Sequence, residues 1–247
     1  MSELVTGNAY IGALSARGSD RKSRAAFLEL ALTLVGPGSH IFDFGCGPGT
    51  DARAYAERGH LVSAYDVDAA MRAHFRLHCA TGIAAGAIQL IEGNFGHFMQ
   101  REASAWPPAE LVTANFAPVN LVDDVASLFH KFATLIQPGG RVLAAVLNPW
   151  FAGDLRYGWW WRGLPLLLAR GRYAVAGAQA PITRWLPGAL AAAASDCFEL
   201  DAIYCPAARA TERPMVRRLR GASPRSWSAF VSSRFIFVLF RHRVPTR

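Results

Sequence analysis

The fold of this chain is decided at residues 42–51, which read Phe42-Asp43-Phe44-Gly45-Cys46-Gly47-Pro48-Gly49-Thr50-Asp51. A short β-type run, residues 40–42, leads into the glycines, and an Ala-rich helical stretch follows them. A strand, a glycine turn and a helix N-terminus form a nucleotide-binding arrangement, because backbone N–H groups there point at the ligand. Glycine lets those groups approach a ligand without a Cβ in the way.

The next strand expected along the chain, residues 61–66, ends in a carboxylate. Asp66 stands seventeen residues after Gly49, where it can accept hydrogen bonds from two ribose hydroxyls. The glycine spacing excludes two other classes of nucleotide-binding loop. The dinucleotide fingerprint G-x-G-x-x-G/A needs Gly or Ala at the place of Thr50, and a P-loop needs a lysine after its glycines.

With Asp43 before the first glycine and Asp66 after the second strand, residues 43–50 resemble the S-adenosylmethionine-dependent methyltransferases of the Rossmann-like class I type. The resemblance is tight over residues 38–70, looser to residue 147, and returns at 182–241. It implies S-adenosyl-L-methionine as cofactor. It also implies a seven-stranded sheet whose last strand is antiparallel.

Hydrophobic periodicity gives the same fold class from the residues themselves. Strands that alternate with helices predict an α/β fold, a doubly wound and mostly parallel sheet. The turn at 138–140, Pro-Gly-Gly, is expected to close a helix before the fifth strand. The pattern predicts strands at 39–45, 61–66, 87–91, 110–115, 141–147, 198–204 and 234–240, and helices at 21–35, 50–58, 68–80, 121–136 and 189–195.

The chain divides into an N-terminal helical cap at 1–35, a core at 36–147 and 185–247, and an aromatic-rich insert at 148–184. The stretch 157–168 of the insert, Tyr-Gly-Trp-Trp-Trp-Arg-Gly-Leu-Pro-Leu-Leu-Leu, is too short to span a bilayer. We favour a lid over an apolar or aromatic substrate. Core packing and a peripheral membrane contact, with arginines at the headgroups, stay open as alternatives.

The resemblance implies a role for each candidate cofactor residue. Asp66 binds the ribose, the glycine-loop backbone lines the methionine side, and Asp43 braces that loop or reaches the ammonium through water. Asn94 bonds the adenine amine, while Phe95 or Val67 covers a ring face. The remaining candidates lie at the fourth strand's end and near the N-terminus. The full set is Tyr10, Asp43, Gly45, Cys46, Gly47, Gly49, Asp66, Val67, Asn94, Phe95, Asn115 and Phe116.

The residues that would contact the methyl acceptor are less clearly marked. Tyr157, Trp160 and Tyr173 of the insert are the candidates, with packing as the alternative. No general base is identified, because His97 and His130 read as surface or satisfied histidines, and the acidic pair 123–124 fits a helix start better. The chain lacks the Pro-Pro-aromatic motif of amine-methylating relatives after its fourth strand, which favours transfer to oxygen.

The composition limits the domain count, the cellular location and the class of partner that we expect. The 247 residues and 52% hydrophobic content fit one domain with insertions, and no run of 18 apolar residues occurs. Four cysteines without paired spacing predict reduced thiols, no metal site and a cytoplasmic location. The net charge of +8 invites a nucleic-acid or anionic-membrane partner, but 24 of the 26 basic residues are arginines, and we read this as compositional bias.

The sequence therefore predicts a methyltransferase that acts on a small apolar or aromatic metabolite, with O-methylation favoured. Two alternatives stay open. The first is an RNA methyltransferase that uses the arginine-rich segment 205–225 to bind phosphates. The second is a non-catalytic binding protein that kept the cofactor fold. Neither the acceptor nor the oligomeric state is specified by the sequence.

Overall fold

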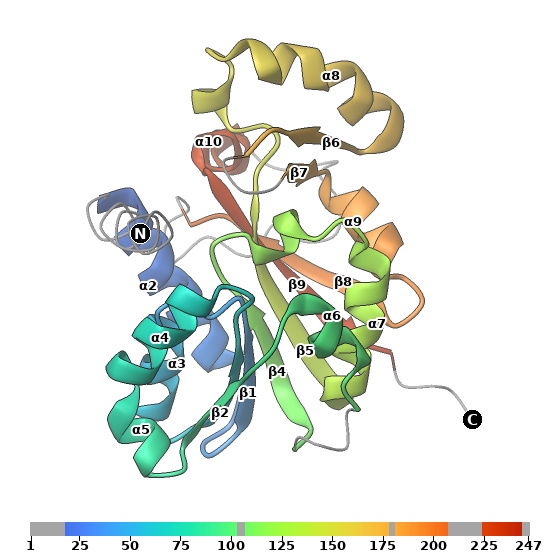
Figure 1. The fold of residues 1–247 in the computed structure, drawn as a ribbon. Helices are drawn as coiled ribbons and strands as arrows, with labels where there is room; N and C mark the ends of the chain where they lie inside the picture. Colours follow the sequence, from blue (N-terminus) through green and yellow to red (C-terminus); the bar gives the residue numbers. More distant parts are fainter. Residues whose placement is uncertain (1–17, 103–106, 178–180, 207–223, 244–247) are drawn as a thin grey trace. The chain divides into compact units, whose positions relative to one another are not determined.

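Figure 1 shows the chain as a computed structural model, which describes residues 18–102, 107–177, 181–206 and 224–243. The chain divides into two compact units. Unit 1 comprises Met1–Asn115 and Thr134–Gly140, and unit 2 comprises Phe116–Ala133 and Arg141–Arg247.

Unit 1 is built on parallel strands. The first strand, β1, pairs with β2 on one side and β4 on the other, and β2 pairs with β3. Every residue of β1 is buried, as expected for a central strand of a parallel sheet. The elements of unit 1 are α2 (Gly18–Thr33), β1 (His40–Phe44), α3 (Thr50–Ala56), β2 (Leu61–Tyr65), α4 (Ala69–His78), α5 (Ala80–Ala84), β3 (Ile88–Ile91), α6 (Phe95–Gln100) and β4 (Ala109–Ala114).

Unit 2 contains antiparallel pairs. Its strand β9 runs antiparallel to both β5 and β8, and β6 and β7 form a separate antiparallel pair. Most of α7 and β5 lies in this unit. Its elements are η2 (Pro118–Leu121), α7 (Val125–Leu135), β5 (Ile136–Leu147), η3 (Ala152–Asp154), α8 (Gly158–Arg170), β6 (Arg172–Val175), β7 (Ile182–Trp185), α9 (Pro187–Ala194), β8 (Phe198–Tyr204), α10 (Pro224–Ser232) and β9 (Phe235–His242).

The seven-stranded sheet has the order β3-β2-β1-β4-β5-β9-β8. The predicted α/β sheet, mostly parallel with an antiparallel last strand, is confirmed. One boundary differs, because residues 138–140 lie inside β5 rather than closing a helix. Gly139 has a φ of 77°, and a Cβ on Gly140 would lie 3.0 Å from the Glu110 carbonyl oxygen, so glycine admits the bend and the close approach.

Several helices also differ from the sequence pattern. The helix expected at 68–80 is divided into α4 and α5, and α6 had no counterpart in the prediction. The helix expected at 121–136 begins only at Val125, after the 3₁₀ turn η2. Short helices carry weak periodicity, so their boundaries depend on packing more than on pattern.

An aromatic cluster holds the carboxyl ends of β1 and β2 in place. Phe44 and Tyr65 are the last residues of these strands, and both rings pack against Phe98 of α6, with centroid distances of 5.6 and 4.4 Å. All three side chains are buried. The loops that follow the two strands therefore start from a rigid base.

Candidate functional site

The glycine loop after β1 is tied to the end of β2 by its own backbone. The N–H groups of Gly45 and Cys46 donate to the Tyr65 carbonyl oxygen at 2.8 and 3.1 Å. Gly45, Gly47 and Gly49 have φ values of 70°, 53° and 85°, in the left-handed region that glycine adopts readily. The curvature of this loop therefore depends on its glycines.

Asp66, the predicted ribose ligand, lies directly against this loop. Its Oδ2 accepts a hydrogen bond from the Gly47 N–H at 2.8 Å, and its Oδ1 accepts one from the Asp68 N–H at 2.8 Å. Burial raises the pKa of this carboxyl, and the two backbone hydrogen bonds oppose the rise. The structure thus places Asp66 next to the glycine loop, as the sequence hypothesis requires.

The turn that carries Asp66 is held by an arginine that the sequence analysis missed. Arg72 of α4 donates to the carbonyl oxygens of Asp66 and Val67 at 2.7 and 2.8 Å. Asp68 is the N-cap of α4 and accepts from the Ala70 N–H at 2.7 Å. The position of Arg72, one turn into this helix, could have indicated the contact from the sequence, because helical side chains point back toward the N-terminus. Val67 itself is largely exposed beside the acid.

Asp43 lies beneath the loop in a buried position at the end of β1. Its Oδ1 accepts a hydrogen bond from the Thr113 hydroxyl at 3.0 Å, while its buried Oδ2 has no partner among the described residues. Burial, with the nearby Asp51 carboxylate as the second cause, raises the pKa of Asp43 to about 8. Asp43 is therefore mainly a neutral acid at neutral pH.

Asp51 is the anionic centre of the polar cluster around Asp43. It forms a 2.6 Å ion pair with Arg24 of α2 and accepts from the Asn115 amide at 2.8 Å. The predicted candidate Asn115 therefore contacts this cluster through its side chain. The sequence analysis missed Arg24, Asp51 and Thr113, which come from three distant segments of unit 1.

The predicted adenine residues have a local structural role. Asn94 is the N-cap of α6, and its side-chain oxygen accepts from the His97 N–H at 2.9 Å. Phe95 is half-buried, with its ring centroid 6.2 Å from that of Phe98. The structure therefore assigns the Asn94 oxygen to helix capping, and its use for adenine stays a prediction.

The other predicted residues lie in unit 2 or outside the described residues. Phe116 has a φ of 60°, which is strained for a non-glycine residue, and its ring packs edge-on against Phe235 at 5.3 Å. Tyr157 is exposed, whereas Trp160 and Tyr173 are buried. Tyr10 lies outside the described residues, as does most of the arginine-rich segment 205–225.

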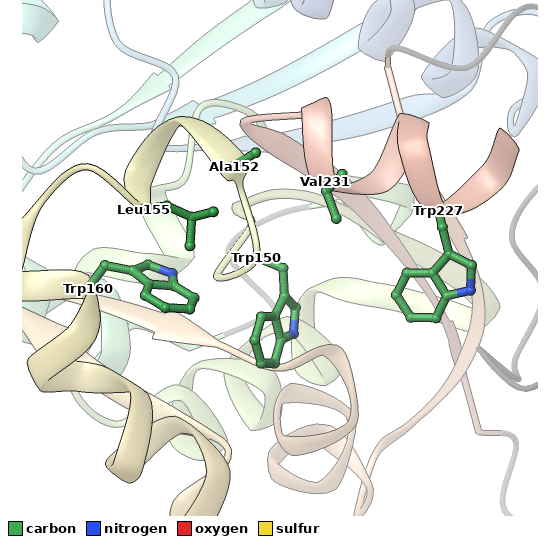
Figure 2. A pocket seen from close by; sticks show the side chains of 6 residues that line it. All are labelled: Trp150, Ala152, Leu155, Trp160, Trp227 and Val231. Carbon is green, nitrogen blue, oxygen red and sulfur yellow. The ribbon is translucent and has the colours of Figure 1, made fainter. Parts of the chain in front are cut away.

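An apolar cleft of about 320 Å³ lies within unit 2 (Figure 2). Trp160 forms one wall, and its indole N–H is already used by the Pro149 carbonyl oxygen at 2.8 Å. The volume is at the lower end of the range for small-molecule sites. The lining residues are Trp150, Ala152, Leu155, Trp160, Trp227 and Val231.

No group of three or more potential metal ligands occurs in the part of the chain that the structure describes. The two histidines weighed as bases, His97 and His130, are exposed. Asp124 accepts from the Ser127 N–H at 3.0 Å near the start of α7, which agrees with a capping role. Cys46, Cys79 and Cys197 are free thiols.

Comparison with known proteins identifies the domain. Residues 41–140 match a family described as "Methyltransferase domain". A ubiquinone biosynthesis O-methyltransferase of Aeromonas salmonicida is 31% identical over 112 residues, which cover 45% of this chain and 44% of that protein. The chain thus spans less than half the length of this curated relative.

Solved structures resemble the whole chain at low identity. One is a chain of the Haloferax volcanii complex between the Trm112 methyltransferase activator and a methyltransferase, with a TM-score of 0.65 and 13% identity, covering 100% of this chain and 98% of that one. Another is the 1,6-didemethyltoxoflavin-N1-methyltransferase of Burkholderia thailandensis, with a TM-score of 0.61 and 14% identity, covering 98% and 87%. Residues 41–140 therefore match a methyltransferase domain, and the chain shares the Rossmann-like fold of S-adenosylmethionine-dependent methyltransferases.

Two features of unit 1 fit this cofactor. A Cβ on Gly47 would meet no atom within 4 Å, so one face of the loop is open to a ligand. The unpartnered Oδ2 of Asp43 lies beneath the same loop, and a cationic cofactor nearby would favour its ionised form. The residues that would hold the nucleoside and the amino acid end therefore lie in one unit.

Proposed function

We propose that the protein transfers a methyl group from S-adenosylmethionine to an oxygen of a small apolar or aromatic acceptor. The observation that carries the proposal is the 2.8 Å hydrogen bond between the Gly47 N–H and the Asp66 carboxylate. It joins the open glycine loop to an acid that can accept from ribose hydroxyls. Both lie within the matched domain at 41–140.

The cofactor supplies an activated methyl group on a sulfonium, so the protein's task is mainly binding and orientation. Asp66 is oriented by the N–H groups of Gly47 and Asp68 before any ligand arrives. Such preorganisation reduces the conformational entropy lost on binding. Asp43 and Asp51 place one neutral and one ion-paired carboxyl near the loop, and a cationic ligand would shift Asp43 toward its ionised form.

Three observations support the acceptor class. The aligned relative from Aeromonas salmonicida is an O-methyltransferase by name. Residues 115–118 read Asn-Phe-Ala-Pro, without the Pro-Pro-aromatic motif of amine methylation. The cleft of unit 2 offers tryptophan and aliphatic walls, which suit an apolar or aromatic molecule.

The first test is calorimetric titration with S-adenosylhomocysteine. We expect binding to the wild type and a loss of about tenfold or more in Asp66→Asn, because an amide replaces a charged acceptor. Glu57→Gln is the control, since Glu57 is an exposed acid that pairs with Arg53 on α3. Equal binding by Asp66→Asn and the wild type would remove the basis of the proposal.

The second test addresses catalysis and the acceptor. Radiolabelled methyl from S-adenosylmethionine should appear in an organic-extractable product of a metabolite extract, with an ether or ester identified by mass spectrometry. Binding without any transfer would favour the non-catalytic alternative. Fractionation of cells tests the cytoplasmic location, which forms part of this proposal.

A further inference from the structure

Helix α8 of the insert has one face that packs against its own unit. Trp160, Gly163 and Leu167 are its buried residues, spaced as one side of a helix. A Cβ on Gly163 would overlap the ring of Tyr173 in β6, so the helix lies close to the β6–β7 pair (Figure 1). This face fixes which side of α8 is presented outward.

A second side of α8 is apolar although it is exposed. Trp161, Pro165 and Leu168 follow each other at helical spacing, and Trp161 and Leu168 are 57% and 67% exposed. A surface helix usually carries polar side chains there. Leu166, on a different side of the helix, is exposed as well. The outward face of α8 is therefore an unpartnered apolar surface of unit 2.

This face continues into the tryptophan-lined cleft. The rings of Trp161 and Trp160 lie 4.9 Å apart, and Trp150 is the next ring at 6.1 Å. Trp227 of α10 lines the other side of the cleft (Figure 2). The exposed Trp161 is therefore connected to the cleft through the buried ring of Trp160.

The charge on this surface has a single sign. Residues 155–184 contain no Asp or Glu, while Arg156, Arg162, Arg170 and Arg172 are exposed. The nearby acid Asp154 is buried and forms a 2.9 Å ion pair with Arg184. The exposed arginines of the insert therefore have no acidic residue beside them within residues 155–184.

We propose that the α8 face and the rim of the cleft bind the surface of an anionic phospholipid bilayer. Tryptophan rings favour the boundary between headgroups and acyl chains, and arginines attract lipid phosphates. None of the described helices has the length and apolar character to cross a bilayer. A two-fold contact with a second copy would instead oppose arginines of like charge. The proposal does not depend on methyl transfer.

The test is co-sedimentation of the full chain with vesicles of phosphatidylglycerol and phosphatidylcholine, compared with vesicles of phosphatidylcholine alone. We expect binding to the anionic vesicles that weakens as salt is added, and little binding to the neutral ones. The triple variant Arg156→Gln/Arg162→Gln/Arg170→Gln should weaken binding by about fivefold for each arginine removed. Leu168→Ser should also weaken it, because less apolar surface enters the interface.

The matched controls are Leu77→Ser, in an exposed leucine of α4, and Arg58→Gln, in an exposed arginine of unit 1. Both should bind vesicles like the wild type, and all variants should keep their titration with S-adenosylhomocysteine. The proposal is overturned if anionic vesicles do not bind the protein, or if the triple variant and Leu168→Ser bind like the controls. A dimer abolished by Leu168→Ser in sedimentation velocity would also overturn it.

Discussion

The pKa of Asp43 depends on its burial and on the residues around it. From the sequence it is an acid before a glycine loop, but its burial and the nearby Asp51 raise its pKa to about 8. Asp51 instead forms an ion pair with Arg24. Asp66, although buried, receives two backbone hydrogen bonds that favour its ionised form. Three acids of unit 1 therefore have three different environments.

The raised pKa of Asp43 predicts how stability depends on pH. The folded chain keeps this proton up to about pH 8, whereas the unfolded chain releases it near the ordinary value of 3.8. The free energy of unfolding therefore falls as pH rises through this window. Asp43→Asn, which has no proton to release, should flatten that slope by up to about 1.4 kcal/mol per pH unit.

Urea unfolding at a series of pH values measures this effect. Asp123→Asn serves as the control, because Asp123 is exposed. If the pH slopes of Asp43→Asn and the wild type coincide, Asp43 does not carry the proton that we assign to it.

At the scale of elements, the insert is anchored by buried polar groups rather than by apolar contacts alone. Arg184 of β7 pairs with Asp154 of η3, and its guanidinium also lies 5.3 Å from the Trp159 ring of α8. Asn148, fully buried, donates to the carbonyl oxygens of Phe230 and Ser233 at 2.6 and 3.0 Å. These contacts connect the insert to α10 within unit 2.

Breaking the Arg184–Asp154 pair should be costly. Arg184→Met leaves the Asp154 carboxylate buried without its partner, and we expect the free energy of unfolding to fall by about 3 kcal/mol. The double variant Arg184→Met/Asp154→Leu should recover much of this loss, because it removes both charges. Chemical denaturation measures both, with Arg162→Met as an exposed control. If the double variant is no more stable than Arg184→Met, the unpaired charge of Asp154 does not cause the loss of stability.

At the scale of the whole molecule, the charge of +8 remains the main argument for a nucleic-acid partner. Several arginines are occupied by acids of the same chain, including Arg53 with Glu57 and Arg241 with Asp201. A binding strip would need free arginines in a row. These ion-paired arginines add nothing to such a strip, and most of the segment 205–225 lies outside the described residues.

We predict that the protein binds single-stranded RNA no more tightly than about 10⁻⁶ M at physiological salt, the upper end of non-specific affinity. Fluorescence anisotropy over a series of salt concentrations measures the affinity and its salt slope. Tighter binding with a steep slope would restore the RNA methyltransferase hypothesis, and removal of the arginines at 205–225 would then locate the site.

The sequence by itself determined the strand–loop–helix at 40–56, the acid at the end of β2 and the alternating α/β order, because these depend on backbone preference and local periodicity. Only the tertiary structure decided that Asp43, Asp51, Thr113 and Arg24 share one buried cluster. It also decided which face of α8 is outward. Such contacts join segments far apart in sequence, and packing rather than local pattern selects them.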